Sequence, residues 1–201
     1  MLQHLRPAVV LLVLLSALTG LVYPLAVTGI AQIALPRQAN GSLIEKDGAV
    51  VGSALIGQNF KSDRYFHPRP SATTDTDPND STKTIDAPYN AAASTGSNLG
   101  PTSQKLVDRV KAGVEAWRTM AGPNPVPADA VTTSASGLDP DVSPQTALAQ
   151  VASVAKARGL AEDKVRQLVD SSIETRFLGL IGEPRVNILR LNLALDQLKS
   201  S

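Results

Sequence analysis

The sequence predicts a soluble α+β domain that follows one N-terminal transmembrane helix. None of the 30 residues from 7 to 36 is charged, whereas residues 37–201 carry 18 basic and 18 acidic side chains. Within residues 37–201, short apolar runs bounded by glycine come first, and apolar residues at helical spacing follow. We therefore divide the chain into a short tail (1–6), a membrane helix (7–36) and a polar α+β domain (37–201).

The composition excludes several classes of protein. The chain has no cysteine, which excludes disulfide scaffolds, thiolate metal sites and cysteine nucleophiles. A net charge of +1 and an aromatic content of 3 % exclude most nucleic-acid-binding proteins. In residues 37–201, only 37 of the 165 residues are Leu, Ile, Val or Phe, which is close to the level of about 20 % that indicates disorder.

The uncharged segment is long enough to cross a lipid bilayer, which takes about 20 apolar residues in a helix. A cleavable signal peptide has an apolar region of about 7–15 residues and a small-residue cleavage site. This segment is longer and ends in ALPR (34–37), without such a site, so we expect a retained anchor. Its flanks, with Arg6 on one side and Arg37 and Lys46 on the other, are similarly basic, so the positive-inside rule does not orient it.

Small and polar residues recur at every fourth position of this segment: Ser16, Gly20, Pro24, Thr28 and Gln32. Residues four apart lie on nearly the same helix face, with a drift of about 40° per step. Small and hydroxyl residues allow transmembrane helices to approach closely, and an intramembrane amide forms hydrogen bonds between helices. Pro24 is expected to kink the helix or to free a carbonyl group. We favour packing against other transmembrane helices over a lone anchor that tolerates polar residues.

The first part of the polar domain is predicted to contain strands. The dipeptides Asn40-Gly41 and Asp47-Gly48 are typical of turns. The short apolar runs near residues 43–44, 49–51 and 54–56 favour strands over helices. Residues 70–103 are rich in Ser, Thr, Asp and Pro, which indicates either a disordered linker or a long binding loop.

The second part of the polar domain has helical patterns. A helix is expected to begin at Thr102 or Ser103, to end before Gly122 and to carry an apolar stripe at Leu106, Val110, Val114 and Trp117. Ser143 before Pro144 predicts a second helix that ends at Gly159. A third helix is expected from about residue 161. The tail is predicted to form a strand over 186–191 and then a short helix to residue 198.

The sequence predicts neither a catalytic residue nor a metal site. His67 lies in a proline-rich loop, and no catalytic or phosphate-binding motif accompanies it. Asp75, Asp77 and Asn79 have the spacing of a calcium loop, but the turn glycine is replaced by Asp80. We interpret this stretch as a solvated acidic loop.

Two glycine-containing stretches, 94–101 and 134–140, precede predicted helices. The start of a helix presents backbone N–H groups that bind anions. Neither stretch has the spacing of a phosphate loop or a lysine, so as nucleotide sites both are weak candidates.

Several blocks of the sequence resemble one known family. Two of them are YNAAASTGSNLGP (89–101) and GEPRVNIL (182–189). The other matching blocks are residues 19–29, 38–43, 52–58, 65–66, 69–72, 126–132, 134–140 and 191–196. With these blocks in this order, the chain resembles the C subunit of the Kdp-type bacterial potassium-transporting ATPase; the acidic stretch 73–86 matches least.

The resemblance implies a non-catalytic role in a complex that hydrolyses ATP to take up potassium. The implied partners are a channel-like potassium-binding subunit, a P-type ATPase subunit, a small membrane subunit and the lipid bilayer, without nucleic acid. The C subunit is described for this family as supporting assembly and as a catalytic chaperone that raises the affinity of the ATPase subunit for ATP. It has no cofactor of its own; the complex handles ATP and potassium. The positions implied for nucleotide contact are Ser134, Ser136, Gly137 and Gln150.

The resemblance also implies a topology. The protein would lie in the bacterial plasma membrane, with a cytoplasmic N-terminus and the polar domain outside. A domain outside the cell cannot contact cytoplasmic ATP, so we expect an indirect effect on ATP affinity, as a coupling free energy through the partner subunits. The alternatives are a stand-alone membrane-anchored extracytoplasmic domain that binds carbohydrate or peptide through its polar loop, and a secreted enzyme.

Overall fold

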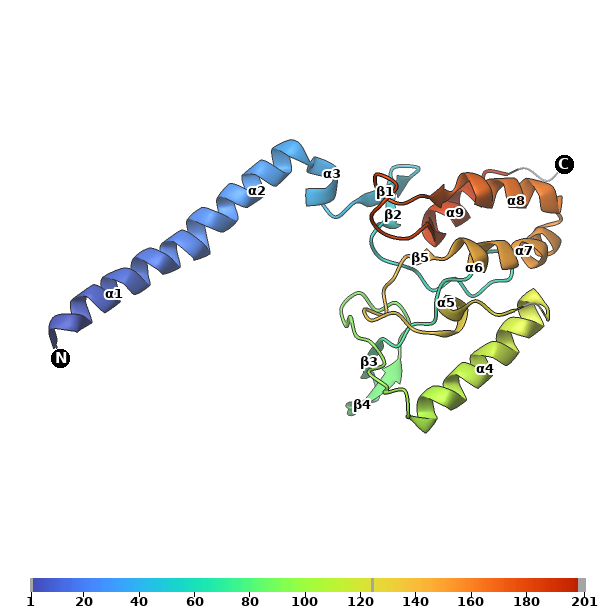
Figure 1. Cartoon of the computed structure of the whole chain (residues 1–201), viewed down its shortest axis with the longest axis horizontal. Helices are drawn as coiled ribbons and strands as arrows, with labels where there is room; N and C mark the ends of the chain where they lie inside the picture. Colours follow the sequence, from blue (N-terminus) through green and yellow to red (C-terminus); the bar gives the residue numbers. More distant parts are fainter. Residues whose placement is uncertain (1, 124, 199–201) are drawn as a thin grey trace. The chain divides into compact units, whose positions relative to one another are not determined.

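A computed structural model describes residues 2–123 and 125–198 of the chain. The chain divides into two units, Met1–Ser53 and Ala54–Ser201, which are described separately (Figure 1). The structure is mixed helix and sheet, and it contains one apolar helix, Gln3–Ala34, that is long enough to cross a membrane. The most apolar 18-residue window of this helix is 0 % buried. The predicted fold class is therefore confirmed.

The long apolar helix contains a π-helical turn just before its proline. It consists of α1 (Leu2–Ala17), the π-helix η1 (Leu18–Val22) and α2 (Tyr23–Ala34). The N–H group of Tyr23 donates to the carbonyl of Leu18, five residues back. In a regular α-helix the ring of Pro24 would collide with the carbonyl of Gly20, four residues back. The wider π turn makes room for the proline without a break in the helix.

The first unit ends in a short helix and a hairpin. Helix α3 (Pro36–Ala39) is followed by strands β1 (Leu43–Lys46) and β2 (Ala49–Ser53), which pair antiparallel. The turn between the strands is Asp47-Gly48, where both residues have positive φ angles of 53° and 78°. This conformation suits an Asp-Gly pair and matches the twist of the strands.

The strand predicted over residues 54–56 is absent, because these residues form a turn. The carbonyl of Ala54 accepts a hydrogen bond from the Asn187 side chain, and the N–H of Gly57 donates to the carbonyl of Leu138. Single hydrogen bonds to distant residues thus satisfy these backbone groups, where a strand would form a series of bonds with a neighbouring strand.

The polar stretch 70–103 contains a second hairpin. Strands β3 (Thr74–Asp77) and β4 (Asp80–Asp86) pair antiparallel. The acidic side chains fold back on their own backbone: the carboxylates of Asp75, Asp77 and Asp80 accept from the N–H groups of the first or second following residue. Of the two predictions for this stretch, the disordered linker is therefore wrong for residues 74–86, and the long binding loop stays a prediction. Composition missed the hairpin because local carboxylate–backbone bonds, and not buried apolar side chains, support it.

The remaining elements of the second unit are helices and a small sheet. The helices are α4 (Gln104–Ala121), α5 (Ala128–Val131), α6 (Pro144–Ala149), α7 (Val151–Arg158), α8 (Glu162–Ser171) and α9 (Ile188–Leu195). The sheet has the order β5-β7-β6, all antiparallel, with β5 (Asp141–Val142), β6 (Ile173–Glu174) and β7 (Arg185–Asn187).

Two of the helix signals occur where the sequence predicts them. The hydroxyl of Ser143 accepts from the N–H of Thr146 at the start of α6, and Gly159 ends α7 in the left-handed conformation. The predicted single helix is interrupted at Gln150. The strand predicted over 186–191 ends at Asn187, because this side chain accepts the N–H of Arg190 and begins α9.

The main core lies in the second unit between the small sheet and helices α6–α9. Its buried members are Phe66, Val142, Ala147, Val151, Val154, Ala155, Val165, Val169, Val186, Ile188, Leu191 and Leu195. A smaller cluster joins α4 to α5 through Trp117, Ala130 and Val131. The cores position the segments 66–73 and 132–140, which lie between the elements and contain most of the candidate site.

Candidate functional site

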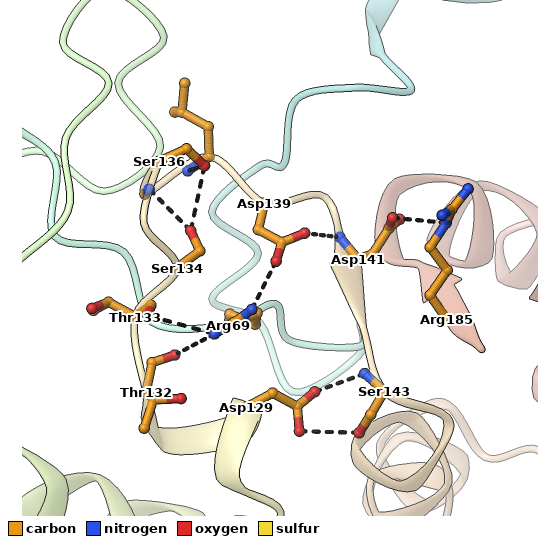
Figure 2. Close-up of polar contacts among 12 residues, drawn as sticks. Arg69, Asp129, Thr132, Thr133, Ser134, Ser136, Asp139, Asp141, Ser143 and Arg185 are labelled. Atoms are coloured by element: carbon orange, nitrogen blue, oxygen red, sulfur yellow. Dashed lines mark hydrogen bonds and ion pairs between the residues drawn. The ribbon is translucent and has the colours of Figure 1, made fainter. Parts of the chain in front are cut away.

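The serines of the 134–140 stretch fold this loop onto itself. The hydroxyl of Ser134 accepts from the N–H of Gly137 at 2.9 Å, and that of Ser136 accepts from the N–H of Leu138 at 3.1 Å (Figure 2). The carbonyl of Ser136 accepts from the hydroxyl of Ser94 at 3.0 Å. Both serine hydroxyls therefore satisfy backbone groups of their own turn.

The two glycine-containing stretches lie against each other. A Cβ atom on Gly137 would lie 2.6 Å from Cγ2 of Thr73 and 2.7 Å from the carbonyl oxygen of Thr95. A Cβ atom on Gly96 would lie 2.7 Å from the carbonyl oxygen of Ala135. Gly137 also has a φ angle of +67°, which disfavours any other residue. These glycines allow two backbones to approach closely, a reason that spacing along the sequence does not reveal.

Arg69 fixes the far end of the same loop. Its Nη1 donates to Oδ2 of Asp139 at 2.8 Å, and its Nη2 donates to the carbonyls of Thr132 and Thr133 at 3.5 and 3.4 Å (Figure 2). The carbonyl of Arg69 accepts from the hydroxyl of Tyr89 at 2.8 Å. Burial raises the pKa of this phenol well above its ordinary range, so Tyr89 stays protonated as a donor.

A second set of charges ties the sheet together beside Asp139. Asp141 pairs with Arg185 at 3.1 Å, and Arg185 pairs with Glu174 at 3.0 Å. Burial raises the pKa of Asp141, although the hydrogen bond from Asn187 and the charge of Arg185 oppose the shift. Compared with the unfolded chain, the folded state therefore binds a proton at Asp141 more tightly. The contribution of this carboxyl group to the free energy of unfolding decreases as the pH rises above 3.8, the ordinary pKa of the group.

Asp129 caps helix α6. Its two carboxylate oxygens accept from the N–H of Ser143 at 2.7 Å, from the Ser143 hydroxyl at 3.0 Å and from the Thr146 hydroxyl at 2.7 Å. A carboxylate at a helix N-terminus satisfies unpaired N–H groups and interacts favourably with the helix dipole. The sequence identified Ser143 as a cap but gave no sign of Asp129, which is 14 residues away.

Two buried side-chain amides hold the segment 66–70, whose two prolines cannot donate to a strand ladder. The side chain of Asn192 accepts from the N–H of Phe66 at 2.9 Å and donates to its carbonyl at 3.0 Å. The side chain of Gln150 accepts from the N–H of His67 at 2.7 Å and donates to its carbonyl at 3.1 Å. Each amide thus pairs with one residue as a neighbouring strand would. Sequence reasoning missed both roles.

The two serines and the glutamine implied for nucleotide contact line two different hollows. Ser134 and Ser136 line an open hollow of about 560 Å³ together with Arg69 and Asp139, and buried Gly137 lies in the same loop. Gln150 lines a different hollow of about 710 Å³, between α4 and α7. Its side chain is 1 % exposed, and both atoms of the amide already have partners in the protein. The structure therefore brings three of the four together and gives all of them a role within the fold.

The five small and polar residues at every fourth position, which we call the band, lie on the exposed surface of the long helix. Ser16, Gly20, Pro24, Thr28 and Gln32 are all exposed. The π turn contains more residues per turn than an α-helix, so it counteracts the drift of a four-residue spacing and draws these positions closer to a line. A residue of the same chain satisfies the amide of Gln32: it exchanges two hydrogen bonds with the amide of Asn40, at 3.1 and 3.3 Å.

Comparison with known proteins gives a consistent result along the whole chain. A family model described as K⁺-transporting ATPase, c chain (KdpC) matches residues 5–197. A potassium-transporting ATPase KdpC subunit from Bradyrhizobium diazoefficiens is 64 % identical over 197 residues, which cover 98 % of both chains. Proteins of the same name from Rhodopseudomonas palustris (62 % identical over 199 residues, 99 % and 100 % of the two chains) and Methylobacterium nodulans (64 % over 198 residues, 98 % of both) are similarly close.

Proposed function

Because this chain belongs to the KdpC family of K⁺-transporting ATPase subunits, we propose that it acts in its complex as a non-catalytic accessory subunit that stabilises the assembly. The observation that carries the proposal is the long apolar helix, whose most apolar window is 0 % buried within the chain. Such a helix needs an apolar environment, which lipid and the helices of partner subunits supply. The candidate site supports the same conclusion, since its polar groups form hydrogen bonds and ion pairs that hold the fold together.

The partners proposed from the family resemblance are a channel-like potassium-binding subunit, a P-type ATPase subunit and a small membrane subunit. We place the complex in the bacterial plasma membrane, with the N-terminus of this chain in the cytoplasm and residues 37–201 outside. The basic flanks of the helix are nearly balanced, so the orientation rests on the resemblance alone.

The band on the membrane helix supplies a test of assembly. Gly20→Leu places a large side chain in the middle of the band, at a position where the chain itself offers no atom within 4 Å of an added Cβ. We expect about 10-fold weaker association with the other subunits (about 1.4 kcal/mol), because the leucine side chain prevents the close approach of helices that small residues allow. The measurement is the amount of this chain that co-purifies with a tagged partner subunit.

Gly29→Leu is the matched control, because Gly29 also has no atom within 4 Å and lies off the band. It is expected to leave the recovery unchanged. Equal recovery of both variants and the wild type would contradict packing through this face and would favour a stand-alone anchored domain.

We further propose that the chain raises the ATP affinity of the ATPase subunit indirectly, as a catalytic chaperone. The alternative is direct contact of ATP with Ser134, Ser136, Gly137 and Gln150. The internal hydrogen bonds of Ser134, Ser136 and Gln150 argue against direct contact, because a nucleotide would have to displace them.

Titration of ATP into the full-length chain in detergent distinguishes these two routes. We expect no saturation at micromolar ATP for the chain alone. Addition of the chain to a complex that lacks it is expected to lower the KM for ATP. Micromolar binding to the chain alone would contradict the indirect route.

A further inference from the structure

The loop between β6 and β7 exposes an unusual set of apolar side chains. Phe177 is 68 % exposed, Leu178 78 %, Leu180 82 % and Ile181 66 %. Among the described residues of the second unit, no other large apolar side chain is as exposed; Leu55 follows at 62 %. Scattered apolar side chains are normal at a protein surface, but a contiguous set usually marks an interaction site.

This loop has a defined shape. The N–H and carbonyl of Phe177 both pair with those of Ile181, at 2.9 and 3.0 Å. The N–H of Leu180 also donates to the carbonyl of Phe177 at 3.1 Å. The reversal places Leu178 at a φ angle of +52°, in the left-handed region that is costly for leucine. The apolar side chains are therefore held on a closed turn.

Ion pairs fasten the base of the loop to the domain. Arg176 pairs with Glu183 across the loop at 2.6 Å, and Arg185 pairs with Glu174 at 3.0 Å. Glu174 also pairs with Arg190 of α9 at 2.8 Å. The loop is thus preorganised, which lowers the entropic cost of binding to a surface of matching shape.

The charges favour a protein over a lipid surface as the partner. Segments that bind membrane surfaces combine apolar side chains with an excess of Lys and Arg, which anionic lipids attract. Residues 174–185 contain two arginines and two glutamates, and each arginine is paired with a glutamate. The loop therefore has no excess cation for lipid headgroups. An apolar centre with Phe, surrounded by satisfied charges, has the composition of a protein–protein interface.

We propose that this apolar loop, residues 176–183, docks the extramembrane domain into an apolar pocket on another subunit of the potassium-transporting complex. The inference rests on the proposed function, because membership in a complex supplies the partner. The four apolar side chains fill the pocket, and the Arg176–Glu183 pair lies at its rim, where it stays in contact with water.

The test is the affinity of the full-length chain for a complex that lacks it, measured in detergent. The double variant Phe177→Ser with Leu180→Ser removes two of the anchors. We expect about 30-fold weaker binding or more, since central aromatic and aliphatic anchors dominate interface energies. The melting temperature is expected to remain that of the wild type, because both side chains are exposed. The matched control is Ile85→Ser with Val107→Ser, two exposed apolar residues on other elements, and is expected to bind as the wild type does.

The binding results distinguish a failure of this inference from a failure of the proposed function. If the wild-type chain does not bind the complex, the proposed function fails. If the wild type binds and the loop variant binds within 2-fold of it (about 0.4 kcal/mol), this inference alone fails.

A photo-crosslinker at Leu180 (Leu180→p-benzoylphenylalanine) identifies the occupant directly. A covalent product with another subunit supports the proposal. Products only with lipid, or only with a second copy of this chain, would overturn it.

Discussion

An alanine in place of Gly137 is expected to lower the free energy of unfolding of the second unit by about 3 kcal/mol. The new Cβ would lie 2.6 Å from Cγ2 of Thr73 and 2.7 Å from the carbonyl oxygen of Thr95, so the two loops would have to separate. Overpacking of this kind costs roughly 1–3 kcal/mol, and an alanine with a positive φ angle adds about 1–2 kcal/mol. The fluorescence of Trp117, the single tryptophan of the chain and buried in the second unit, reports the transition.

Gly159→Ala separates the two contributions to this cost. Gly159 has nearly the same φ angle, +66° against +67°, but no atom lies within 4 Å of an added Cβ. This variant is expected to lose only the backbone contribution, about 1 kcal/mol. Equal losses in the two variants would show that the close approach of the loops contributes nothing, contrary to the packing described above.

The helices of the second unit could largely be predicted, because their signals are local. The apolar stripe from Leu106 to Trp117 identifies α4, although Val107 beside it remains exposed. Ser143 and Gly159 mark the two ends of α6–α7 through bonds to residues within one turn. Information of this kind is contained in a short window of sequence, so a pattern of spacing is enough to find it.

The elements that the sequence missed depend on distant partners or on unusual local chemistry. The β3–β4 hairpin has few large apolar residues, and its carboxylates support the backbone in place of a core. The turn at 54–56 is set by contacts to Leu138 and Asn187. The π turn follows from Pro24, whose effect was expected, but an expected kink does not specify how the helix accommodates it.

The candidate site shows the same limit. The sequence suggests the stretches 94–101 and 134–140 as separate weak candidates for anion sites. In the structure the two stretches are in contact, and each leaves no room for a side chain at the glycine of the other, Gly96 or Gly137. Arg69 and Asp139 are 70 residues apart and form an ion pair. A single sequence contains no signal for such pairs, so the roles of Arg69, Asp129 and Asn192 could be found only in the fold.

Replacing Gln150 with leucine is expected to lower the free energy of unfolding by about 3 kcal/mol. The substitution introduces an apolar side chain of similar size and leaves the N–H and carbonyl of His67 without the partners that Gln150 supplies. A buried group without a partner costs roughly 1–3 kcal/mol; the two groups of His67 are part-buried, so we take a value near the lower end, about 1.5 kcal/mol, for each. The two prolines inside the segment, Pro68 and Pro70, have no N–H groups to donate, so a neighbouring strand cannot replace the amide. For a domain of this size the loss corresponds to a decrease in Tm of about 6–12 °C, measured by the fluorescence of Trp117.

The matched control is Gln145→Leu, an exposed position in helix α6, which ends just before Gln150; for it we expect a change within about 0.5 kcal/mol. The pair also separates the structural role of Gln150 from nucleotide contact. A structural amide predicts a large loss of stability and, in complexes purified below the transition, an unchanged KM for ATP. A nucleotide contact predicts the opposite result, an unchanged stability and a raised KM for ATP, because a side chain that binds ATP contributes to affinity and not to the fold of the free chain. A wild-type Tm together with a raised KM would therefore contradict the pairing of Gln150 with His67 as its function.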